Sequence, residues 1–147
     1  MMGLAERMAL AGVAAVALAG CRQQPAEVKA DSGREIYIAR CAVCHGENEE
    51  GRPGMYPPLA GSEWVNGPPE RLAAIILDGM QGPVGGYNAV MPGWRGYLRD
   101  AEIATLMTWL RQGKPAVTAV DVGRVDDQTD TRNAFWTAED LKALRLR

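Results

Sequence analysis

The chain has 147 residues, a length that suggests one folded domain with appendages. Hydrophobic residues make up 47% of the chain, but the first twenty residues raise this fraction, so the rest has material for only a modest core. The formal net charge is −2 and the basic residues form no block, which argues against a nucleic-acid partner.

The N-terminal residues have the pattern of a targeting signal. Arg7 precedes an apolar run from Met8 to Ala19, which is too short to span a bilayer as a helix of the mature protein. We therefore expect residues 1–20 to be a signal peptide and the protein to be exported.

The end of this run, Leu18-Ala19-Gly20-Cys21, resembles the lipobox of bacterial lipoproteins. The resemblance implies that Cys21 is lipidated, becomes the first residue of the mature protein and anchors it to the membrane on the periplasmic or extracytoplasmic face of the cell envelope. The alternative is an ordinary signal peptide cleaved nearby, with Cys21 as a stray thiol. Residues 21–31 are largely polar and have no hydrophobic period, so we expect a flexible tether.

Cys41, Cys44 and His45 form the Cys-x-x-Cys-His motif that is typical of covalent haem c attachment. In a helix, residues three apart share a face, so both thiols can add to the two vinyl groups of one porphyrin, with His45 beside them as an iron ligand. A dithiol redox centre and half of a zinc site are the alternatives. The first is expected in a βαβ setting, and no strand pattern precedes this motif. The second lacks ligands, because Cys21 is the one other cysteine and His45 the one histidine.

The folded domain is expected to begin near residue 32. A cap at Asp31 or Ser32 predicts a first helix in which Tyr37 lies on the same face as the two cysteines. The stretch 46–54 has no apolar period and predicts a loop. Its acidic residues are expected to be a solvated surface, with docking of a partner as the alternative.

The motif and its surroundings resemble class I cytochrome c. The resemblance is carried by Gly33 and Tyr37 before the motif, by Pro57-x-Leu59-x-Gly61 after it, and by Met91-Pro92 further on. It implies an all-α fold, with about three core helices and loops wrapped round one haem. It also implies that the Pro57 carbonyl accepts a hydrogen bond from His45 and that Leu59 presses on the haem.

The stretch 62–78 is predicted to be a turn followed by a helix. Pro68 and Pro69 pre-set the first turn of that helix, and Gly79 ends it. Its inward stripe consists of Leu72, Ile75 and Ile76. The glycine- and proline-rich stretch 80–92 predicts a loop.

Four methionines compete for the sixth position of the iron. Met55 is too close in sequence to His45 to reach the opposite haem face easily, and Met107 falls in a helical stripe. Met80 lies just past a helix end and stays as an alternative. The resemblance favours Met91, so we expect His45 and Met91 to be the two axial ligands.

The stretch 100–112 predicts an amphipathic helix. The resemblance implies that this helix crosses the first one, with Trp109 near Gly33 and Tyr37. The resemblance covers the domain that we assign to residues 32–113.

Residues 114–147 go beyond a minimal cytochrome, and we assign them to a C-terminal extension. Two patterns in it resemble capping boxes with aspartate in place of glutamate, and they predict two short helices. The patterns are Thr118-x-x-Asp121 and Thr137-x-x-Asp140. Phe135 and Trp136 between the helices are expected to pin the extension onto the domain. A partner-docking arm is the alternative.

A histidine and a methionine together fill the axial positions of a haem iron, so no site remains for substrate or dioxygen. We therefore expect a one-electron carrier of a bacterial respiratory or dehydrogenase chain, with redox proteins as donor and acceptor, no small-molecule substrate and no enzymatic activity. Two alternatives remain. One is a dedicated cytochrome subunit of a dehydrogenase or terminal oxidase, and the other is a thiol-disulfide oxidoreductase that uses Cys41 and Cys44.

Overall fold

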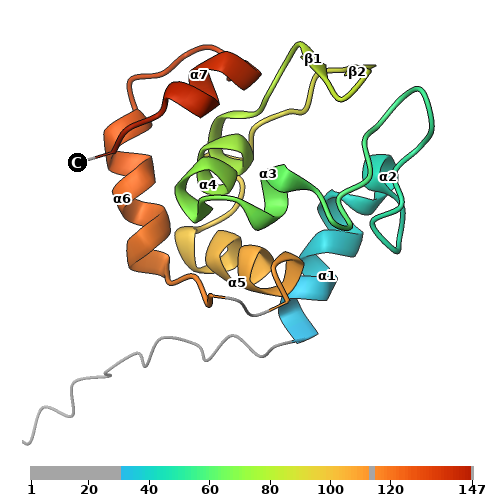
Figure 1. The fold of residues 1–147 in the computed structure, drawn as a ribbon. Coiled ribbons are helices and arrows are strands. Elements are labelled where there is room, and N and C mark those ends of the chain that lie inside the picture. Colours follow the sequence, from blue (N-terminus) through green and yellow to red (C-terminus); the bar gives the residue numbers. More distant parts are fainter. Residues whose placement is uncertain (1–30, 113–114, 147) are drawn as a thin grey trace, which may run out of the picture.

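The computed structural model describes residues 31–112 and 115–146 (Figure 1). In chain order its elements are α1 (Asp31–Arg40), α2 (Ala42–His45), α3 (Glu63–Asn66), α4 (Pro69–Asp78), β1 (Pro83–Val84), β2 (Tyr87–Asn88), α5 (Asp100–Leu110), α6 (Ala119–Thr129) and α7 (Ala138–Ala143). The expected signal peptide, Cys21 and most of the expected tether lie outside the described residues. Within the two described ranges, none of the helices combines the length and the apolar character needed to cross a lipid bilayer.

The predicted first helix is present, with a break at Cys41 between α1 and α2. The backbone N–H of Cys41 donates to the Tyr37 carbonyl at 2.8 Å, and the N–H of His45 donates to the Cys41 carbonyl at 2.9 Å. Helical hydrogen bonding therefore continues across the break, and it keeps Cys41 and Cys44 one turn apart.

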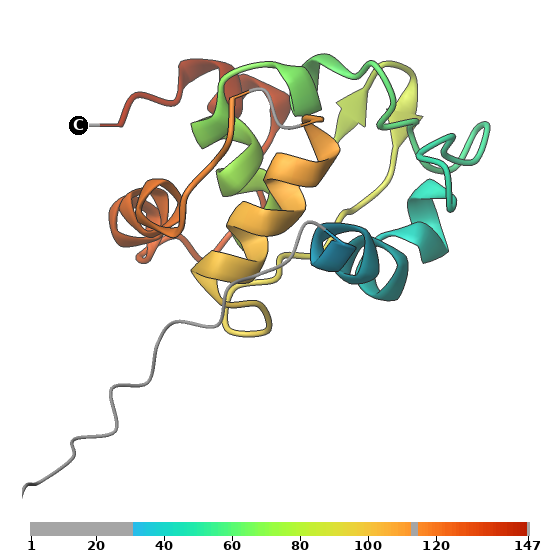
Figure 2. The ribbon, with the colours of Figure 1, turned by 90° about the horizontal axis from the view of Figure 1, so that it is seen from below.

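α1 crosses α5 at close range, as expected (Figures 1 and 2). A Cβ added to Gly33 would lie 2.6 Å from the Trp109 Cβ and 2.8 Å from the Thr105 carbonyl oxygen, so the backbones can approach this closely only at a glycine. The Tyr37 ring packs against the Trp109 ring, with 4.9 Å between the centroids. This crossing packs α1, which leads into the cysteine motif, against α5.

The stretch predicted to be a turn before α4 contains a short helix, α3. Ser62 caps this helix, because its Oγ accepts a hydrogen bond from the Trp64 N–H at 3.2 Å. α4 has Pro69 as its first residue and ends before Gly79, whose φ of 78° is readily adopted only by glycine. Both ends of α4 were therefore predicted correctly, whereas the helical turn capped by Ser62 was missed.

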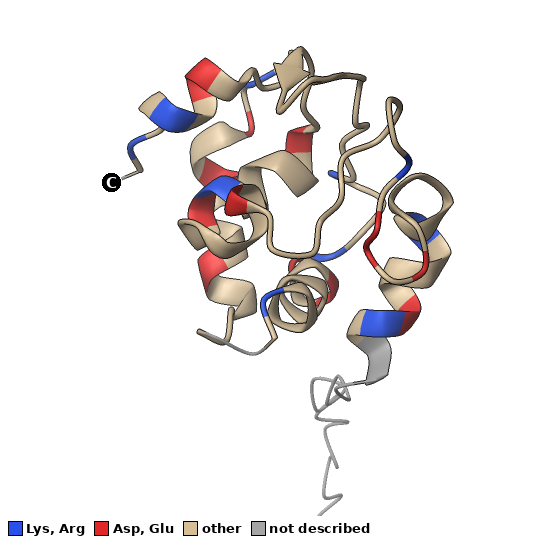
Figure 3. Ribbon diagram, turned by 45° about the vertical axis from the view of Figure 1, so that its right-hand side comes forward, with Lys and Arg blue, Asp and Glu red and all other residues tan. Residues whose placement is uncertain are grey.

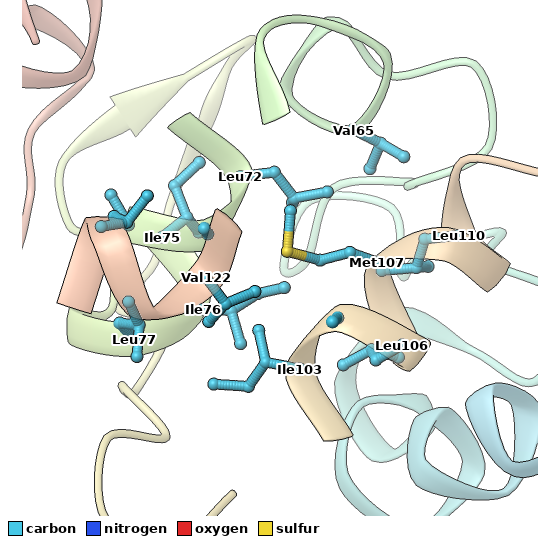
Figure 4. Close-up of a cluster of buried hydrophobic side chains, with 14 of the residues drawn as sticks. Val65, Leu72, Ile75, Ile76, Leu77, Ile103, Leu106, Met107, Leu110 and Val122 are labelled. Atoms are coloured by element: carbon cyan, nitrogen blue, oxygen red, sulfur yellow. The ribbon is translucent and has the colours of Figure 1, made fainter. Parts of the chain in front are cut away.

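The hydrophobic core lies between α4, α5 and α6 (Figure 4). Every side chain from Leu72 to Leu77 is buried, which is more than the predicted stripe, because α4 contacts α3, α5, α6 and α7. Met107 of α5 is fully buried, as expected for a core methionine, and Val122 of α6 completes the cluster. Full burial of one leucine or isoleucine side chain contributes about 1.5–3 kcal/mol, so this core can hold the surrounding loops in place.

The loop predicted from residue 80 to 92 contains a small antiparallel hairpin of two short strands. Val84 of β1 pairs with Tyr87 of β2, and Gly85 and Gly86 form the turn. Both glycines have positive φ, 57° and 86°, as a tight two-residue hairpin turn of type I′ requires. The fold is otherwise helical, as the resemblance to class I cytochrome c implied.

Both predicted helices of the C-terminal extension are present. Thr118 and Thr137 cap α6 and α7, and each exchanges hydrogen bonds with the aspartate three residues later. α6 packs on α4 and α5, and α7 packs on α4, so the extension lies on the side of the domain away from α2 (Figures 1 and 2). Trp136 is buried as expected, whereas Phe135 remains 38% exposed.

Candidate functional site

A cavity of about 290 Å³ opens beside α2, α4 and α5. All six residues predicted to surround a haem line it, namely Cys41, Cys44, His45, Pro57, Leu59 and Met91. Most of the other lining side chains are apolar, and among them are Val65, Leu72, Ile75, Ile76, Leu106 and Leu110. We call residues 40–59 the proximal wall of the cavity and residues 79–95 the distal wall.

His45 in the proximal wall is buried, and its ring has one fixed orientation. Its Nδ1 lies 3.0 Å from the Pro57 carbonyl oxygen. Because a carbonyl can only accept, Nδ1 carries the proton and Nε2 is left with a lone pair for a metal. Burial lowers the pKa of His45, and the hydrogen bond to Pro57 opposes this only in part, so the imidazole is neutral at neutral pH. This hydrogen bond is the one that the resemblance implied.

Cys41 and Cys44 are free thiols at the edge of the same cavity. Burial, with a smaller contribution from the charge of Cys44, raises the pKa of Cys41 to about 11. The nucleophilic cysteine of a dithiol redox centre has a lowered pKa instead. The environment of Cys41 therefore argues against a thiol-disulfide oxidoreductase.

The loop after α2 carries Pro57 to its place beside His45. The N–H of Gly51 donates to the His45 carbonyl at 2.7 Å, and a Cβ on Gly51 would lie 2.6 Å from the Tyr56 carbonyl oxygen. The Tyr37 hydroxyl donates to the Gly46 carbonyl at 2.6 Å, which ties the start of the loop to α1. The hydrogen bonds at Gly46 and Gly51 were not predicted from the sequence, although a glycine at each position was a signal for a tight turn.

Acidic side chains gather on this loop and on α6 (Figure 3). Glu47 and Glu50 are exposed, as expected for a solvated surface. Glu49 is half-buried, and burial raises its pKa. Its backbone carbonyl accepts a hydrogen bond from the Leu59 N–H at 2.9 Å, so part of the acidic stretch also holds Leu59 in the cavity wall.

The distal wall brings two methionines to the cavity, Met80 and Met91. Their backbones form an antiparallel pair, in which the Met80 N–H donates to the Met91 carbonyl at 3.0 Å and the Met91 N–H donates to the Met80 carbonyl at 2.8 Å. Directly paired residues place their side chains on the same face. Met80 and Met91 thus line the cavity, whereas the other two candidate ligands do not. Met55 is 57% exposed, and Met107 is buried in the core.

Sequence reasoning missed Arg40, Trp64 and Trp94, which also line the cavity. The Arg40 guanidinium lies 5.7 Å from the centre of a Trp94 ring, so it spans the proximal and distal walls. Apart from His45, Arg40 is the one basic side chain among the described lining residues. Arg40 directly precedes Cys41, so its place beside the motif was a signal that could have identified it, whereas no local pattern marks Trp64.

Residues 28–110, more than half of the chain, match the sequence family described as Cytochrome C oxidase, cbb3-type, subunit III. This chain belongs to the cytochrome c family. Cytochromes c carry covalently bound haem c, and the apolar cavity with two thiols, an oriented imidazole and two thioethers on its walls fits that group.

Three relatives show the range of this cytochrome family. Cytochrome c-552 of Thermus thermophilus is 35% identical over 123 residues, which cover 78% of this chain and 85% of that protein. The cytochrome c subunit of alcohol dehydrogenase (quinone) from Gluconobacter oxydans is 33% identical over 87 residues, which cover 56% of this chain and 18% of that subunit. The CcoP subunit of the cbb3-type cytochrome c oxidase of Azospirillum brasilense is 32% identical over 114 residues, 74% of this chain and 36% of that subunit. The chain therefore spans most of a small cytochrome but only a minor part of the two larger subunits.

Proposed function

We propose that this protein is a monohaem one-electron carrier, with haem c attached through Cys41 and Cys44 and with His45 and Met91 as the axial ligands. The observation that carries the proposal is a single apolar cavity that has the cysteine motif on one wall and a methionine thioether on the other. A bound haem supplies a reversible Fe(III)/Fe(II) couple, and a methionine ligand favours the reduced state.

The residues around the cavity have separate tasks in this proposal. Pro57 holds the His45 ring with Nε2 free for the iron. Leu59, Ile75 and Leu106 exclude water from the cavity, which keeps the reorganisation that accompanies electron transfer small. With a haem bound, His45 and Met91 would both hold the iron and would leave no position for a substrate, which supports electron transfer between proteins over enzymatic catalysis.

The pairing of Met80 with Met91 supports both thioethers as candidates for the distal ligand. We propose Met91 because the Met91-Pro92 element carries the resemblance to class I cytochrome c. In that assignment Met80 is an apolar neighbour that packs beside the ligand.

A second candidate is a dedicated cytochrome subunit of a dehydrogenase or terminal oxidase complex. The names of two relatives favour it, since one is the cytochrome c subunit of an alcohol dehydrogenase and the other is the CcoP subunit of an oxidase. The coverage of cytochrome c-552 favours the free carrier. Purification from membranes under mild conditions separates the two, because a subunit stays with its complex through gel filtration and a carrier elutes alone.

The membrane anchor is part of the proposal. Residues 1–20 act as a lipoprotein signal peptide, lipidated Cys21 holds the protein at the membrane, and residues 21–31 tether the cytochrome domain 32–113 and the extension 114–147. The Leu18-Ala19-Gly20-Cys21 sequence supports it. Detergent phase partitioning tests the anchor. We expect the wild-type protein to enter the detergent phase and the Cys21→Ser variant to stay in the aqueous phase. If both partition into the aqueous phase, there is no lipid on Cys21.

The haem assignment is tested by expressing the protein together with a working cytochrome c maturation system and recording a pyridine haemochrome spectrum after denaturation. We expect one haem per chain that stays with the denatured polypeptide, because thioether bonds survive unfolding. A colourless protein in which Cys41 and Cys44 are both free thiols would rule out the proposed function. The same result would revive the thiol-disulfide alternative.

A further inference from the structure

The segment Gly79–Gln81 lies between Met91 and the C-terminal extension. On one side, Met80 exchanges two backbone hydrogen bonds with Met91. On the other side, the Trp136 N–H donates to the Gly79 carbonyl at 3.1 Å, and the Gln81 N–H donates to the Trp136 carbonyl at 2.8 Å. The extension therefore pairs directly with the segment on which Met91 rests.

Side chains repeat this connection at the end of α4. Asp78 accepts a hydrogen bond from Nε of Arg95 at 2.7 Å and one from Nε1 of Trp136 at 3.1 Å, each on a different carboxylate oxygen. The Asp78 side chain is nearly inaccessible to solvent, so both hydrogen bonds are shielded from competing water. One carboxylate thus joins the distal wall to the extension.

Arg95 also reaches α6. Its Nη2 donates to Oγ1 of Thr129 at 2.8 Å, and its guanidinium forms an ion pair with Asp126. The backbone of the same stretch is attached to α4, because the Trp94 N–H donates to the Ile76 carbonyl at 2.8 Å and the Arg95 N–H donates to the Leu77 carbonyl at 2.9 Å. The chain is therefore held on both sides of Met91, before it through Met80 and after it through Arg95.

None of the described residues of the extension lines the cavity. The extension can therefore influence the haem site only through the residues that it positions. The distal wall between residues 79 and 95 contains five glycines, and such a chain loses much conformational entropy when it is held in one arrangement. Anchors from outside the wall reduce that cost before any ligand bond forms.

We propose that the C-terminal extension is a positioning element that holds Met91 over the cavity and so strengthens the methionine–iron bond. Trp136 and Thr129 are the positioning residues, and they act through Asp78, Arg95 and the Met80–Met91 pair. The proposal rests on Met91 as the distal ligand. It gives the extension a role in ligation that differs from the docking of a partner.

The test is the affinity of the oxidised holoprotein for imidazole, which must displace the methionine to bind the iron. The double variant Trp136→Phe with Thr129→Val removes the hydrogen bonds from Trp136 to Asp78 and from Arg95 to Thr129. Valine keeps the shape of threonine and phenylalanine keeps an aromatic ring, while the ion pair of Arg95 with Asp126 is left in place. We expect it to bind imidazole about fivefold to tenfold more tightly than wild type, in the range of typical couplings between linked sites. We also expect a weaker sulfur-to-iron charge-transfer band in the near infrared.

The matched control is Thr118→Ala, which removes the cap of α6 at the end away from Thr129. It lowers the stability of the extension but leaves Arg95 and Asp78 in place, so its imidazole affinity should stay within about twofold of wild type. If the extension had a purely structural role, both variants would change the imidazole affinity by similar amounts, and that result would overturn the proposal. Should the double variant not fold, Thr129→Val alone is compared with Thr118→Ala by the same titration.

Met91→Ala, measured in parallel, separates the two proposals. If it keeps the charge-transfer band, the ligand assignment is wrong and the positioning proposal is wrong with it. If it loses the band while the double variant binds imidazole as wild type does, only the positioning proposal is overturned.

Discussion

The two walls of the cavity are held in different ways. The proximal wall is built from residues close together in sequence, with the His45 ring hydrogen-bonded to Pro57 only twelve residues later. The distal wall depends on partners far along the chain, since Asp78 and Trp136 are 58 residues apart. Attachment of the haem is therefore a property of a local motif, whereas its distal ligation depends on the tertiary fold.

The difference predicts which changes abolish the cofactor and which only alter it. A change in the proximal wall removes atoms that would bond to the haem, and no other cysteine of the described residues can replace them. A change in the distal wall leaves the haem attached and alters one ligand.

Replacing both cysteines, in Cys41→Ala with Cys44→Ala, should abolish covalent attachment completely, because no sulfur of the motif is then left to form a thioether bond. A haem-stained denaturing gel checks this. Val43→Ala is the matched control, since Val43 lies between the two cysteines, is 69% exposed and should leave attachment unchanged. Haem that stays with the denatured double variant would show that the motif is not the attachment site.

Met91→Ala should leave the haem attached and abolish the near-infrared sulfur-to-iron band of the oxidised protein, because no thioether then reaches the iron. The reduction potential should fall, since a methionine ligand favours the ferrous state. Met80→Leu, an apolar replacement of similar volume, is the control and should keep the band. If the band survives Met91→Ala and disappears in Met80→Ala, Met80 is the ligand.

The same division explains how far the sequence could predict the structure. The cysteine motif and the two capping boxes of the extension rest on short patterns, and the resemblance to class I cytochrome c implied the crossing of the helices at Gly33. The described residues have the predicted helices at these places. The hairpin was missed although Gly85-Gly86 is a common two-residue turn signal, because the strands on either side have only two residues each.

The contacts between the distal wall and the extension had no signal in the sequence. The carboxylate of Asp78 bonds to Arg95 and Trp136, and nothing in the spacing of these residues indicates a contact. Arg111 is a further case, a buried arginine whose Nη1 donates to the Val65 and Gly67 carbonyls at 2.6 and 2.7 Å and so fixes α3 to the end of α5. In the sequence alone, such residues cannot be distinguished from charged residues of the surface, because their partners are distant in the chain.

Gly33→Ala tests the crossing that supports the proximal wall. Alanine is the better helix former by about 1 kcal/mol, but the added Cβ would lie 2.6 Å from the Trp109 Cβ, and such overpacking costs about 1–3 kcal/mol. We therefore expect a net loss of stability in denaturant unfolding of the holoprotein. In the control, Gly123→Ala on α6, the added Cβ meets only the Asp100 carboxylate at 3.1 Å, so helix propensity should dominate. A gain in stability for Gly33→Ala would show that α1 and α5 are farther apart.

Tyr37→Phe should have the smallest effect, because it deletes one hydrogen bond of the proximal wall and leaves the packing on Trp109 in place. The Gly46 carbonyl loses its donor at 2.6 Å, which should cost about 1 kcal/mol of folding stability at neutral pH.

Burial is the largest cause that raises the pKa of Tyr37, with smaller contributions from Glu49, Cys41 and Glu50. Above the ordinary tyrosine pKa of about 10, the unfolded wild-type chain releases a proton that the folded protein keeps, so the free energy of unfolding of the wild type falls with rising pH. The gap in free energy of unfolding between the wild type and Tyr37→Phe therefore narrows. Urea unfolding at neutral and alkaline pH measures this difference in stability. The control is Tyr97→Phe, because the Tyr97 side chain is 78% exposed. A gap that stays constant across this range would mean that the Tyr37 hydroxyl ionises as easily in the folded protein as in the unfolded chain.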